Sequence, residues 1–205
     1  MSYLMAAIYD RMMSRAEGSF LRPWRHDLIS HAYGKVLEIG AGTGANHPYY
    51  SSEVRQIVGT DPDPHMLAKL SKRPWPMAGV KTEWIEASVE DLPFESGSFD
   101  TVVATFVLCS VHDVMRALTE IRRMLRPGGR YLFLEHVAAS EGSLLLRLQR
   151  GIEPMYRRIS GNCHLTRQPH HQLESAGFVV NECTTDLIPI GGLIKDTVRG
   201  IATAC

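Results

Sequence analysis

The chain has 205 residues, of which 44% are hydrophobic and 21% are charged, and this composition is ordinary for one globular domain with a buried core. Its 22 Lys and Arg residues balance its 22 Asp and Glu residues, so any attraction to nucleic acid or anionic lipid has to be local. No apolar run approaches the roughly 18 residues of a membrane span, and residues 1–9 are too short for a signal peptide, which predicts a protein that is soluble or at most peripheral to a membrane.

The cysteines are Cys109, Cys163, Cys183 and Cys205. They form no CxxC pair and show no spacing typical of metal ligands. We therefore expect a reducing compartment, the cytoplasm, and no metal site. Cys109 is interpreted as a small core residue.

Helical spacing of apolar residues predicts two helices ahead of the first strand, over residues 2–16 and 21–33. Leading helices of this kind commonly cover a cofactor cleft. We interpret residues 1–33 as a covering segment within a single domain that spans residues 1–205.

A glycine-rich turn follows the first predicted strand, residues 36–39, and contains Gly40, Gly42 and Gly44. Glycine permits a tight turn and lets the backbone approach a ligand to contact distance, because no Cβ stands in the way. Asp61 ends a second β-rich run about 20 residues later, where an acid can accept both hydroxyls of a ribose. The pattern predicts a site for a nucleoside-bearing cofactor.

The glycines alone do not identify that cofactor, because Gly40-x-Gly42-x-x-Ala45 also satisfies the relaxed dinucleotide fingerprint. Glu38 discriminates between the two ligands. An acid two positions before the first glycine would repel a pyrophosphate, whereas it suits an ammonium group. S-adenosylmethionine carries an ammonium group and NAD does not, so we favour S-adenosylmethionine. A tight turn without a ligand is the remaining alternative.

Beyond the glycines, residues 43–51 are predicted to form a short helix whose N-terminal amides face the cofactor. Pro64 opens the next helix, over residues 65–72, with Asp63 as its cap. Met66 in that helix would lie over the ligand, where we favour an adenine contact over simple core packing.

Ser110 and Asp113 have the spacing of a capping box, and the helix behind them is ended by Pro127-Gly128-Gly129. Strands alternate with the helices, at residues 36–39, 56–60, 80–87, 101–105 and 130–137. This alternation predicts a parallel sheet with right-handed crossovers, whose ligand site lies at the carboxyl ends of the strands.

Residues 141–167 break the alternation, with five Arg against two Glu. One helical face collects apolar residues, the arginines lie mostly on the other face, and Pro154 should kink or split the helix. The apolar residues are Leu144, Leu148, Ile152, Met155 and Ile159. We interpret the segment as a helical lid insertion over the acceptor site. A solvated surface helix and a membrane-surface patch are the alternatives. Residues 167–176 are predicted as a helix, and residues 178–185 and 193–204 as the last two strands.

Several strings resemble the class I S-adenosylmethionine-dependent methyltransferases. They are Glu38-Ile39-Gly40-Ala41-Gly42-Thr43-Gly44, Asp61, Leu92-Pro93-Phe94, Phe99-Asp100-Thr101-Val102-Val103 and Leu125-Arg126-Pro127-Gly128-Gly129. This resemblance implies an α/β fold that is Rossmann-like: a doubly wound, seven-stranded, mostly parallel sheet with an antiparallel last strand.

Other strings resemble the methyltransferase-like protein 7 family, whose members are alkyl thiol S-methyltransferases. They are Gly42-Thr43-Gly44-Ala45-Asn46, Asp61-Pro62-Asp63-Pro64, Val107-Leu108-Cys109-Ser110-Val111, Glu135-His136-Val137-Ala138-Ala139 and Gly161-Asn162-Cys163-His164-Leu165-Thr166-Arg167. The best-known members of that family begin with a hydrophobic membrane anchor, and this sequence shows no such stretch.

The predicted contacts to S-adenosylmethionine come from the glycine turn, the ribose-binding turn and the strand ends. They are Glu38, Gly40, Ala41, Gly42, Gly44, Asn46, Asp61, Pro62, Met66, Ser88, Val89 and Thr105. Ser88 stands where many class I enzymes have an aspartate that accepts from the adenine amino group. Losing that charge weakens binding by about tenfold, and Glu90 or Asp91 could substitute.

The predicted reaction is methyl transfer to a small-molecule sulfur, in a thiol or hydrosulfide. His136 and His112, at the carboxyl edge of the sheet, are the predicted catalytic residues, since an imidazole can take the proton or stabilise the thiolate. A thiol with a pKa of about 8.5 needs no strong base, whereas an amine with a pKa of about 10 does. The sequence shows no carboxylate pair at this edge that could serve as such a base, which favours sulfur. N-methylation of phosphatidylethanolamine or another small amine is the alternative.

Two further classes of function are less favoured. Complete Gly40, Glu38 and Asp61 positions argue against a binding module that has lost catalysis. No Asn-Pro-Pro-Tyr string follows the fourth strand, which argues against nucleic-acid or protein methylation. The expected partner is therefore a small molecule and not nucleic acid, with peripheral membrane contact through residues 141–167 as an option.

Overall fold

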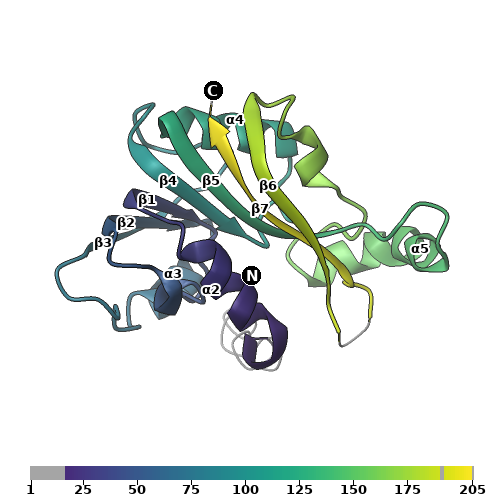
Figure 1. Cartoon of the computed structure of the whole chain (residues 1–205). Helices are drawn as coiled ribbons and strands as arrows, with labels where there is room; N and C mark the ends of the chain where they lie inside the picture. Colours follow the sequence, from purple (N-terminus) through teal and green to yellow (C-terminus); the bar gives the residue numbers. More distant parts are fainter. Residues whose placement is uncertain (1–16, 190–191, 205) are drawn as a thin grey trace.

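The computed structural model describes residues 17–189 and 192–204, so the helix predicted over residues 2–16 lies outside the described residues. Seven strands form one sheet through the molecule (Figure 1). They are β1 (Gly34–Ile39), β2 (Val54–Asp61), β3 (Lys81–Glu86), β4 (Phe99–Thr105), β5 (Leu125–Val137), β6 (Phe178–Leu187) and β7 (Asp196–Ala204).

The strand order is β3-β2-β1-β4-β5-β7-β6. Adjacent strands among β1 to β5 pair in parallel, whereas β7 is antiparallel to both β5 and β6. The predicted seven-stranded, Rossmann-like sheet with an antiparallel last strand is therefore confirmed. The order reverses between β1 and β4, and open α/β sheets bind ligands beyond the carboxyl ends of strands at such a switch point.

Four α-helices and three shorter helical turns precede or connect the described strands. The α-helices are α2 (Arg22–Ile29), α3 (Pro64–Leu70), α4 (Val114–Met124) and α5 (Leu144–Ile159). The shorter elements are the π-helix η1 (Glu17–Leu21) and the 3-10 helices η2 (His47–Tyr49) and η3 (Pro169–Gln172).

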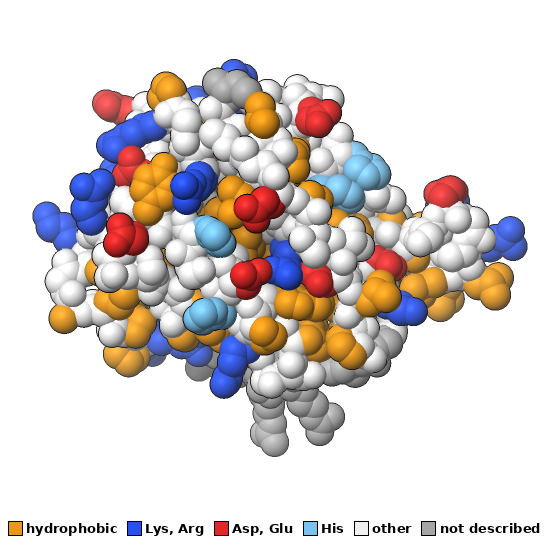
Figure 2. Space-filling view, in the orientation of Figure 1, with side chains coloured by type: hydrophobic (Ala, Val, Ile, Leu, Met, Phe, Trp, Pro, Cys, Tyr) orange, Lys and Arg blue, Asp and Glu red, His pale blue; other side chains and the backbone are white. Residues whose placement is uncertain are grey.

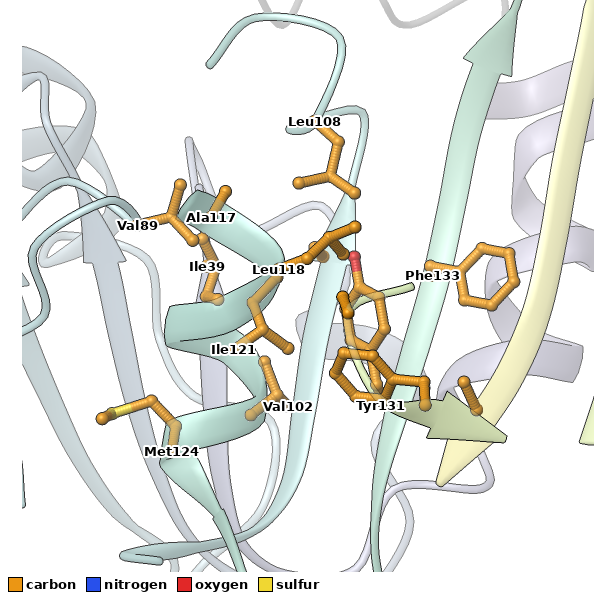
Figure 3. Packing of buried hydrophobic residues seen from close by; sticks show 14 of the residues in the cluster. Ile39, Val89, Val102, Leu108, Ala117, Leu118, Ile121, Met124, Tyr131 and Phe133 are labelled. Carbon is orange, nitrogen blue, oxygen red and sulfur yellow. The ribbon is translucent and has the colours of Figure 1, made fainter. Parts of the chain in front are cut away.

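Two hydrophobic clusters cover the two faces of the sheet, because successive residues of a strand point to opposite faces. Tyr131 and Phe133 of β5 pack with Leu118 and Ile121 of α4 in one cluster (Figure 3). Leu132, next to them in sequence, packs in the second cluster with residues of α2. The sheet is thus held between helices, and its carboxyl-terminal edge is left to the loops.

Two predicted helices are wrong. Residues 43–51 form only the turn η2, because Gly44 has a left-handed φ of +82° and the amides bond three residues back, as His47 N–H does to Gly44 O. No α-helix N-terminus therefore faces the cofactor there. The helix predicted over residues 167–176 is reduced to η3 and turns, in which His171 N–H bonds Gln168 O.

Helix capping is partly as predicted. Asp63 caps α3, since its side chain accepts from His65 N–H at 2.9 Å. The capping box proposed for Ser110 is wrong: Asp113 itself is the N-cap of α4, and its Oδ1 accepts from Arg116 N–H at 3.1 Å. Aspartate is among the preferred N-cap residues, so Asp113 caps the helix itself and does not act as the fourth residue of a capping box that begins at Ser110.

The helical part of the predicted lid is one helix, α5, that contains Pro154, so of the two predicted effects of Pro154 the split is wrong and the kink stays a prediction. Proline has no backbone N–H, so the helical hydrogen bond from position 154 to the carbonyl of Arg150 cannot form. Arg150 is exposed, and water can bond to its carbonyl instead. The apolar stripe points outward: the exposed fractions are 80% for Leu144, 52% for Leu148 and 65% for both Met155 and Ile159. Figure 2 shows hydrophobic and basic side chains together on the projection at the right, where Figure 1 places α5.

No helix within residues 17–189 and 192–204 is both long and apolar enough to cross a bilayer.

Candidate functional site

The glycine turn after β1 leaves one open approach to its backbone. Gly40, Gly42 and Gly44 all have positive φ, of +60°, +54° and +82°. A Cβ at Gly40 would lie 2.6 Å from Val107 Cγ2, and one at Gly44 would lie 2.8 Å from the His47 ring. At Gly42 the nearest atom would be Gly40 O, at 3.8 Å. Gly40 and Gly44 are therefore required by packing, whereas Gly42 faces space that a ligand can occupy.

Asp61, at the end of β2, is tied to this turn by hydrogen bonds. Gly42 N–H donates to Asp61 Oδ2 at 3.0 Å, and Asp63 N–H donates to Oδ1 at 2.9 Å. Burial raises the pKa of the Asp61 carboxyl, and the two backbone hydrogen bonds oppose that shift. Each oxygen keeps a lone pair for a further donor.

Glu38, at the end of β1, is enclosed in a polar network. Asn46 Nδ2 donates to its Oε1 at 2.9 Å and Tyr50 Oη donates to its Oε2 at 3.0 Å. Burial raises the pKa of Glu38 to about 7, and the hydrogen bonds from Asn46 and Tyr50 act in the opposite direction. Glu38 thus holds Asn46 in place beneath the glycine turn.

Arg25 of α2 completes the network, and the sequence analysis missed it. One guanidinium nitrogen, Nη1, donates to Asn46 Oδ1 at 2.6 Å and to Thr105 Oγ1 at 2.8 Å. Its Nη2 lies 3.0 Å from a carboxylate oxygen of Glu17. A signal was present in the sequence, because Arg25 stands at helical spacing from Leu28 and so on the buried stripe of the predicted helix.

The residues predicted for the adenine lie around the end of β3. Ala87 N–H bonds Asp61 O at 3.3 Å, which places the following Ser88 and Val89 beside the turn that is predicted to bind the ribose. Val89 and Met66 are buried, and Pro62 is exposed. Ala41 is also buried and donates its N–H to Thr60 O at 2.9 Å.

Of the two substitutes for the missing adenine-binding aspartate, Glu90 contacts Ser88 through its side chain, whereas Asp91 bonds Ser88 O through its backbone N–H. Ser88 Oγ lies 3.4 Å from Glu90 Oε2, while Glu90 Oε1 accepts from Asp113 N–H at 2.6 Å. Asp91 is exposed.

The opposite side of the site lies beyond β4 and β5. Phe106, directly after β4, has a φ of +59°, which a bulky residue adopts only when its surroundings impose it. Glu135 Oε1 imposes the turn by accepting from Val107 N–H at 3.0 Å and Leu108 N–H at 2.9 Å. Burial raises the pKa of Glu135 to about 7, against these two hydrogen bonds.

That turn brings Cys109 to His136 and Cys163, and we call these three residues the Cys-His-Cys cluster. His136 Nε2 lies 2.9 Å from Cys163 Sγ, and the three sulfur and nitrogen atoms all lie within 4.8 Å of one another. The exposed fractions are 2%, 3% and 7% for Cys109, His136 and Cys163. The sequence pointed to His136 but not to the two cysteines as its neighbours, because each comes from a different loop.

The cluster is electrostatically coupled. A hydrogen bond from Cys109 lowers the pKa of Cys163, and the same bond together with burial raises that of Cys109. Burial acts to lower the pKa of His136, but the neighbouring Cys109 sulfur and Glu135 raise it overall. His136 Nδ1 has no hydrogen-bond partner among the described residues, so the ring is held through Nε2.

Segment 161–167 is docked on the loop after β4 by side chains that bond its backbone. Arg167 Nη1 donates to Leu108 O at 2.9 Å and to Val111 O at 2.7 Å. Asn162 Nδ2 donates to Ser110 O at 2.8 Å. The position of Cys163 beside Cys109 is therefore fixed by a network and not by a chance contact.

Helix α5 lies over this segment. Glu153 Oε2 accepts from Thr166 N–H at 2.8 Å and Thr166 Oγ1 at 2.7 Å, and a Glu153 oxygen lies 3.4 Å from His164 Nδ1. Tyr156, one turn on, is half-buried, and burial together with the nearby Cys163 and Cys109 raises its pKa to about 12. The inner side of α5 thus meets the segment that carries Cys163.

His112, the second predicted catalytic residue, is not in the cluster. Its side chain is exposed, and its backbone O accepts from Arg167 Nη2 at 3.4 Å.

Comparisons with known proteins find similarity to methyltransferases. A protein-family model described as a methyltransferase domain matches residues 37–133. The chain is 38% identical over 186 residues to the thiol S-methyltransferase TMT1B of Homo sapiens, covering 86% of this chain and 74% of that protein. It is 34% identical over 146 residues to a phosphatidylethanolamine N-methyltransferase of Cereibacter sphaeroides, covering 70% of each. The fold is similar to that of the N-methyltransferase NodS of Bradyrhizobium japonicum in complex with S-adenosyl-L-homocysteine, with a TM-score of 0.65, 17% identity and coverage of 90% and 84%.

Proposed function

The chain belongs to the family of the thiol S-methyltransferase TMT1B, and on this premise we propose that it methylates the sulfur of a small thiol or hydrosulfide with S-adenosylmethionine. The observation that carries the proposal is the Cys-His-Cys cluster at the carboxyl edge of the sheet. It is a buried site of soft donors next to the cofactor loop. The cofactor supplies the methyl group on its sulfonium.

The cofactor side fits S-adenosylmethionine. Gly42 has open space where a Cβ would stand, and Asp61 keeps lone pairs for the ribose hydroxyls. Val89, Met66 and Ser88 line the adenine end. The remaining predicted contacts, Glu38, Asn46 and Thr105, hold one another and shape the floor of the turn. Their part is to keep the loop in one conformation before the ligand arrives.

The acceptor side favours sulfur over an amine. An ammonium with a pKa of about 10 needs a free carboxylate to take its proton. Glu153 accepts from Thr166 and Glu135 Oε1 accepts from two backbone amides, whereas Glu135 Oε2 is buried and has no hydrogen-bond partner among the described residues, so it is the oxygen that an amine would have to use as a base. A thiol requires only modest help, and His136 lies where it can favour the thiolate.

The deciding assay measures S-adenosylhomocysteine production across alkyl and aryl thiols, hydrosulfide, phosphatidylethanolamine vesicles, catechols and small amines. A variant with both Glu38→Ala and Asp61→Ala is the blank. We expect turnover confined to sulfur acceptors and rising with pH toward the pKa of the thiol. Turnover on vesicles or amines alone would establish the N-methyltransferase alternative instead.

His136 is tested in the same assay. Because general acid–base help contributes about 10²–10⁴-fold, His136→Asn should lower kcat/KM for thiols by at least about 10²-fold with the affinity for S-adenosylhomocysteine unchanged. His171→Asn, at an exposed histidine, is the control. His112 stays a prediction, and His112→Asn in this series tests it. An unchanged rate for His136→Asn would remove His136 from the reaction.

We also propose that α5 rests on an anionic lipid surface, since four large apolar side chains of one helix are exposed together beside arginines. Arg147 and Arg158 are exposed and can meet phosphate headgroups. The contact would bring apolar thiols dissolved in the membrane to the lid. The net charge of zero makes this attraction local to the helix.

Co-sedimentation with vesicles of phosphatidylcholine, with and without phosphatidylserine, tests the membrane contact. We expect binding only to the anionic vesicles, and its loss in Leu148→Glu with Met155→Glu. Leu187→Glu, at an exposed apolar residue of β6, is the matched control. Equal binding by both variants, or a concentration-dependent dimer that the α5 variant abolishes, would refute lipid docking.

A further inference from the structure

The Cys-His-Cys cluster has the composition of a metal site. We propose that Cys109 Sγ, His136 Nε2 and Cys163 Sγ bind one zinc ion, with the fourth position open to the sulfur of the acceptor. The coordination of the acceptor sulfur rests on the proposed function, whereas the binding of zinc by the three side chains does not. The spacing of the three ligands in the sequence does not predict the site, because they come from three separate elements. Cys109 follows β4, His136 lies at the end of β5, and Cys163 lies in the loop after α5.

The donor atoms select the kind of metal. Two thiols and an imidazole suit zinc, whereas magnesium and calcium require oxygen ligands. The grouped donors among residues 17–189 and 192–204 are these three only, with no carboxylate in the group. Three protein ligands with one free position are typical of catalytic zinc, whereas structural sites have four.

The separations are within reach of tetrahedral coordination. Zinc bonds of about 2.3 Å to sulfur and about 2.0 Å to nitrogen place neighbouring ligand atoms roughly 3.5–3.8 Å apart. The three atoms here lie within 4.8 Å of one another, and the shortest pair, His136 Nε2 to Cys163 Sγ, is at 2.9 Å. That pair has to open by about 0.6 Å, which a small rotation of the Cys163 side chain supplies.

The ligands are positioned by surroundings that do not depend on a metal. Glu135 fixes the turn that carries Cys109, and β7 pairs with β5 at His136. Arg167 and Asn162 fix the loop that carries Cys163. Cysteines that only fill a core need no such hydrogen bonds to fix their loops, since they pack as small hydrophobic residues.

The charges balance in the metal-bound state. Binding displaces the thiol protons of Cys109 and Cys163 to solvent, and His136 binds as a neutral imidazole, so zinc and its two thiolates are together neutral. A thiol acceptor that takes the fourth position forms a sulfur–zinc bond and releases its proton to solvent. In the metal-bound form His136 favours the thiolate as a ligand of zinc, in place of the acid–base role that it has without the metal.

Cobalt(II) substitution of the full chain tests the metal site. A variant with Cys183→Ser and Cys205→Ser leaves Cys109 and Cys163 as its only thiols. Chelator-treated protein, kept reduced with a phosphine, is titrated with Co²⁺. We expect one ion per chain, a thiolate-to-cobalt charge-transfer band, and full displacement by one equivalent of Zn²⁺. Adding Cys163→Ser or His136→Gln should weaken binding by at least about tenfold.

Addition of a small alkyl thiol to the cobalt form, without any cofactor, tests the fourth position. We expect a second change in the charge-transfer band that the alcohol of the same chain length does not cause. No change would overturn coordination of the acceptor, even with the metal bound. This readout does not involve methylation, so it is independent of whether the acceptor assay fails.

The metal site itself is overturned if the protein with two remaining thiols gives no charge-transfer band, or if Cys163→Ser keeps it. Should the triple variants fail to fold, the spectrum of the Cys183→Ser, Cys205→Ser protein decides alone. A Cys109–Cys163 disulfide in place of free thiols, detected by mass spectrometry under the same reducing conditions, would also refute the proposal.

Discussion

Arg25 Nη1 lies 2.6 Å from Asn46 Oδ1, and this contact joins the covering helix α2 to the glycine turn. Asn46 in turn bonds Glu38, so a residue of the N-terminal segment reaches the floor of the cofactor site through one intermediate. Arg25 is buried, and Phe106 lies under its guanidinium, with 5.8 Å to the ring centroid. The helix is thereby coupled to both sides of the site, since Phe106 belongs to the acceptor-side turn.

Replacing Arg25 should therefore cost stability as well as cofactor affinity. Arg25→Met leaves Asn46 Oδ1 buried without this donor, at about 1–3 kcal/mol, whereas Thr105 Oγ1 keeps Asn46 Nδ2 as a donor at 3.2 Å. We expect the free energy of unfolding in urea to fall by about 1–3 kcal/mol. Arg22→Met, at an exposed arginine of the same helix, should change it by less than about 0.5 kcal/mol. Equal effects of the two substitutions would contradict this role.

Glu38 should give the protein a distinctive dependence on pH. Its pKa of about 7 in the folded state lies above the usual 4.5, so the folded state binds more protons between these values. Stability from this group is fully present below pH 4.5 and is lost as the pH rises through 7. Glu38→Gln removes the titration, and the wild type should weaken relative to it by at most about 3 kcal/mol from pH 4.5 to 8. Parallel curves of Tm against pH for the two proteins would show that Glu38 does not titrate in this range.

Asp61 should affect cofactor binding far more than folding. Asp61→Asn removes the charge that we predict accepts from the ribose hydroxyls, and hydrogen bonds to a charged group contribute about 1.5–3 kcal/mol. Calorimetry should therefore show S-adenosylhomocysteine binding weakened by about 10- to 100-fold. Glu86→Gln is the matched control, because Glu86 pairs with Asp61 across β2 and β3 and is exposed. A loss of affinity in that control would implicate the general charge of this edge.

The glycines of the turn should differ in their tolerance of a side chain. Gly44→Ala places a Cβ 2.8 Å from both the His47 ring and a methyl of Leu70, in addition to the strain of a positive φ. We expect a loss of about 2–4 kcal/mol from the two effects together. Gly97→Ala shares the positive φ, +67°, but meets nothing within 4 Å, so only about 1–2 kcal/mol should be lost. Similar melting temperatures for the two variants would mean that His47 and Leu70 move away from the new Cβ at Gly44 without loss of stability.

The parts of the site that follow strands in sequence were predictable. Gly42 and Asp61 were assigned from a run of β-forming residues followed by glycine or an acid, and they do bond one another. The helices over residues 43–51 and 167–176 were not predictable, since turn bonds that span three residues replace the longer ones of an α-helix.

The sequence by itself determined the sheet, the cofactor turn and the position of His136, because periodicity and turn chemistry act over a few neighbouring residues. Only the tertiary structure decided that Arg25 reaches Asn46, that Cys109 and Cys163 meet His136, and that the apolar face of α5 points outward. These three outcomes depend on contacts between segments that are distant along the chain. Such contacts form only once the sheet has brought the carboxyl ends of its strands to one edge.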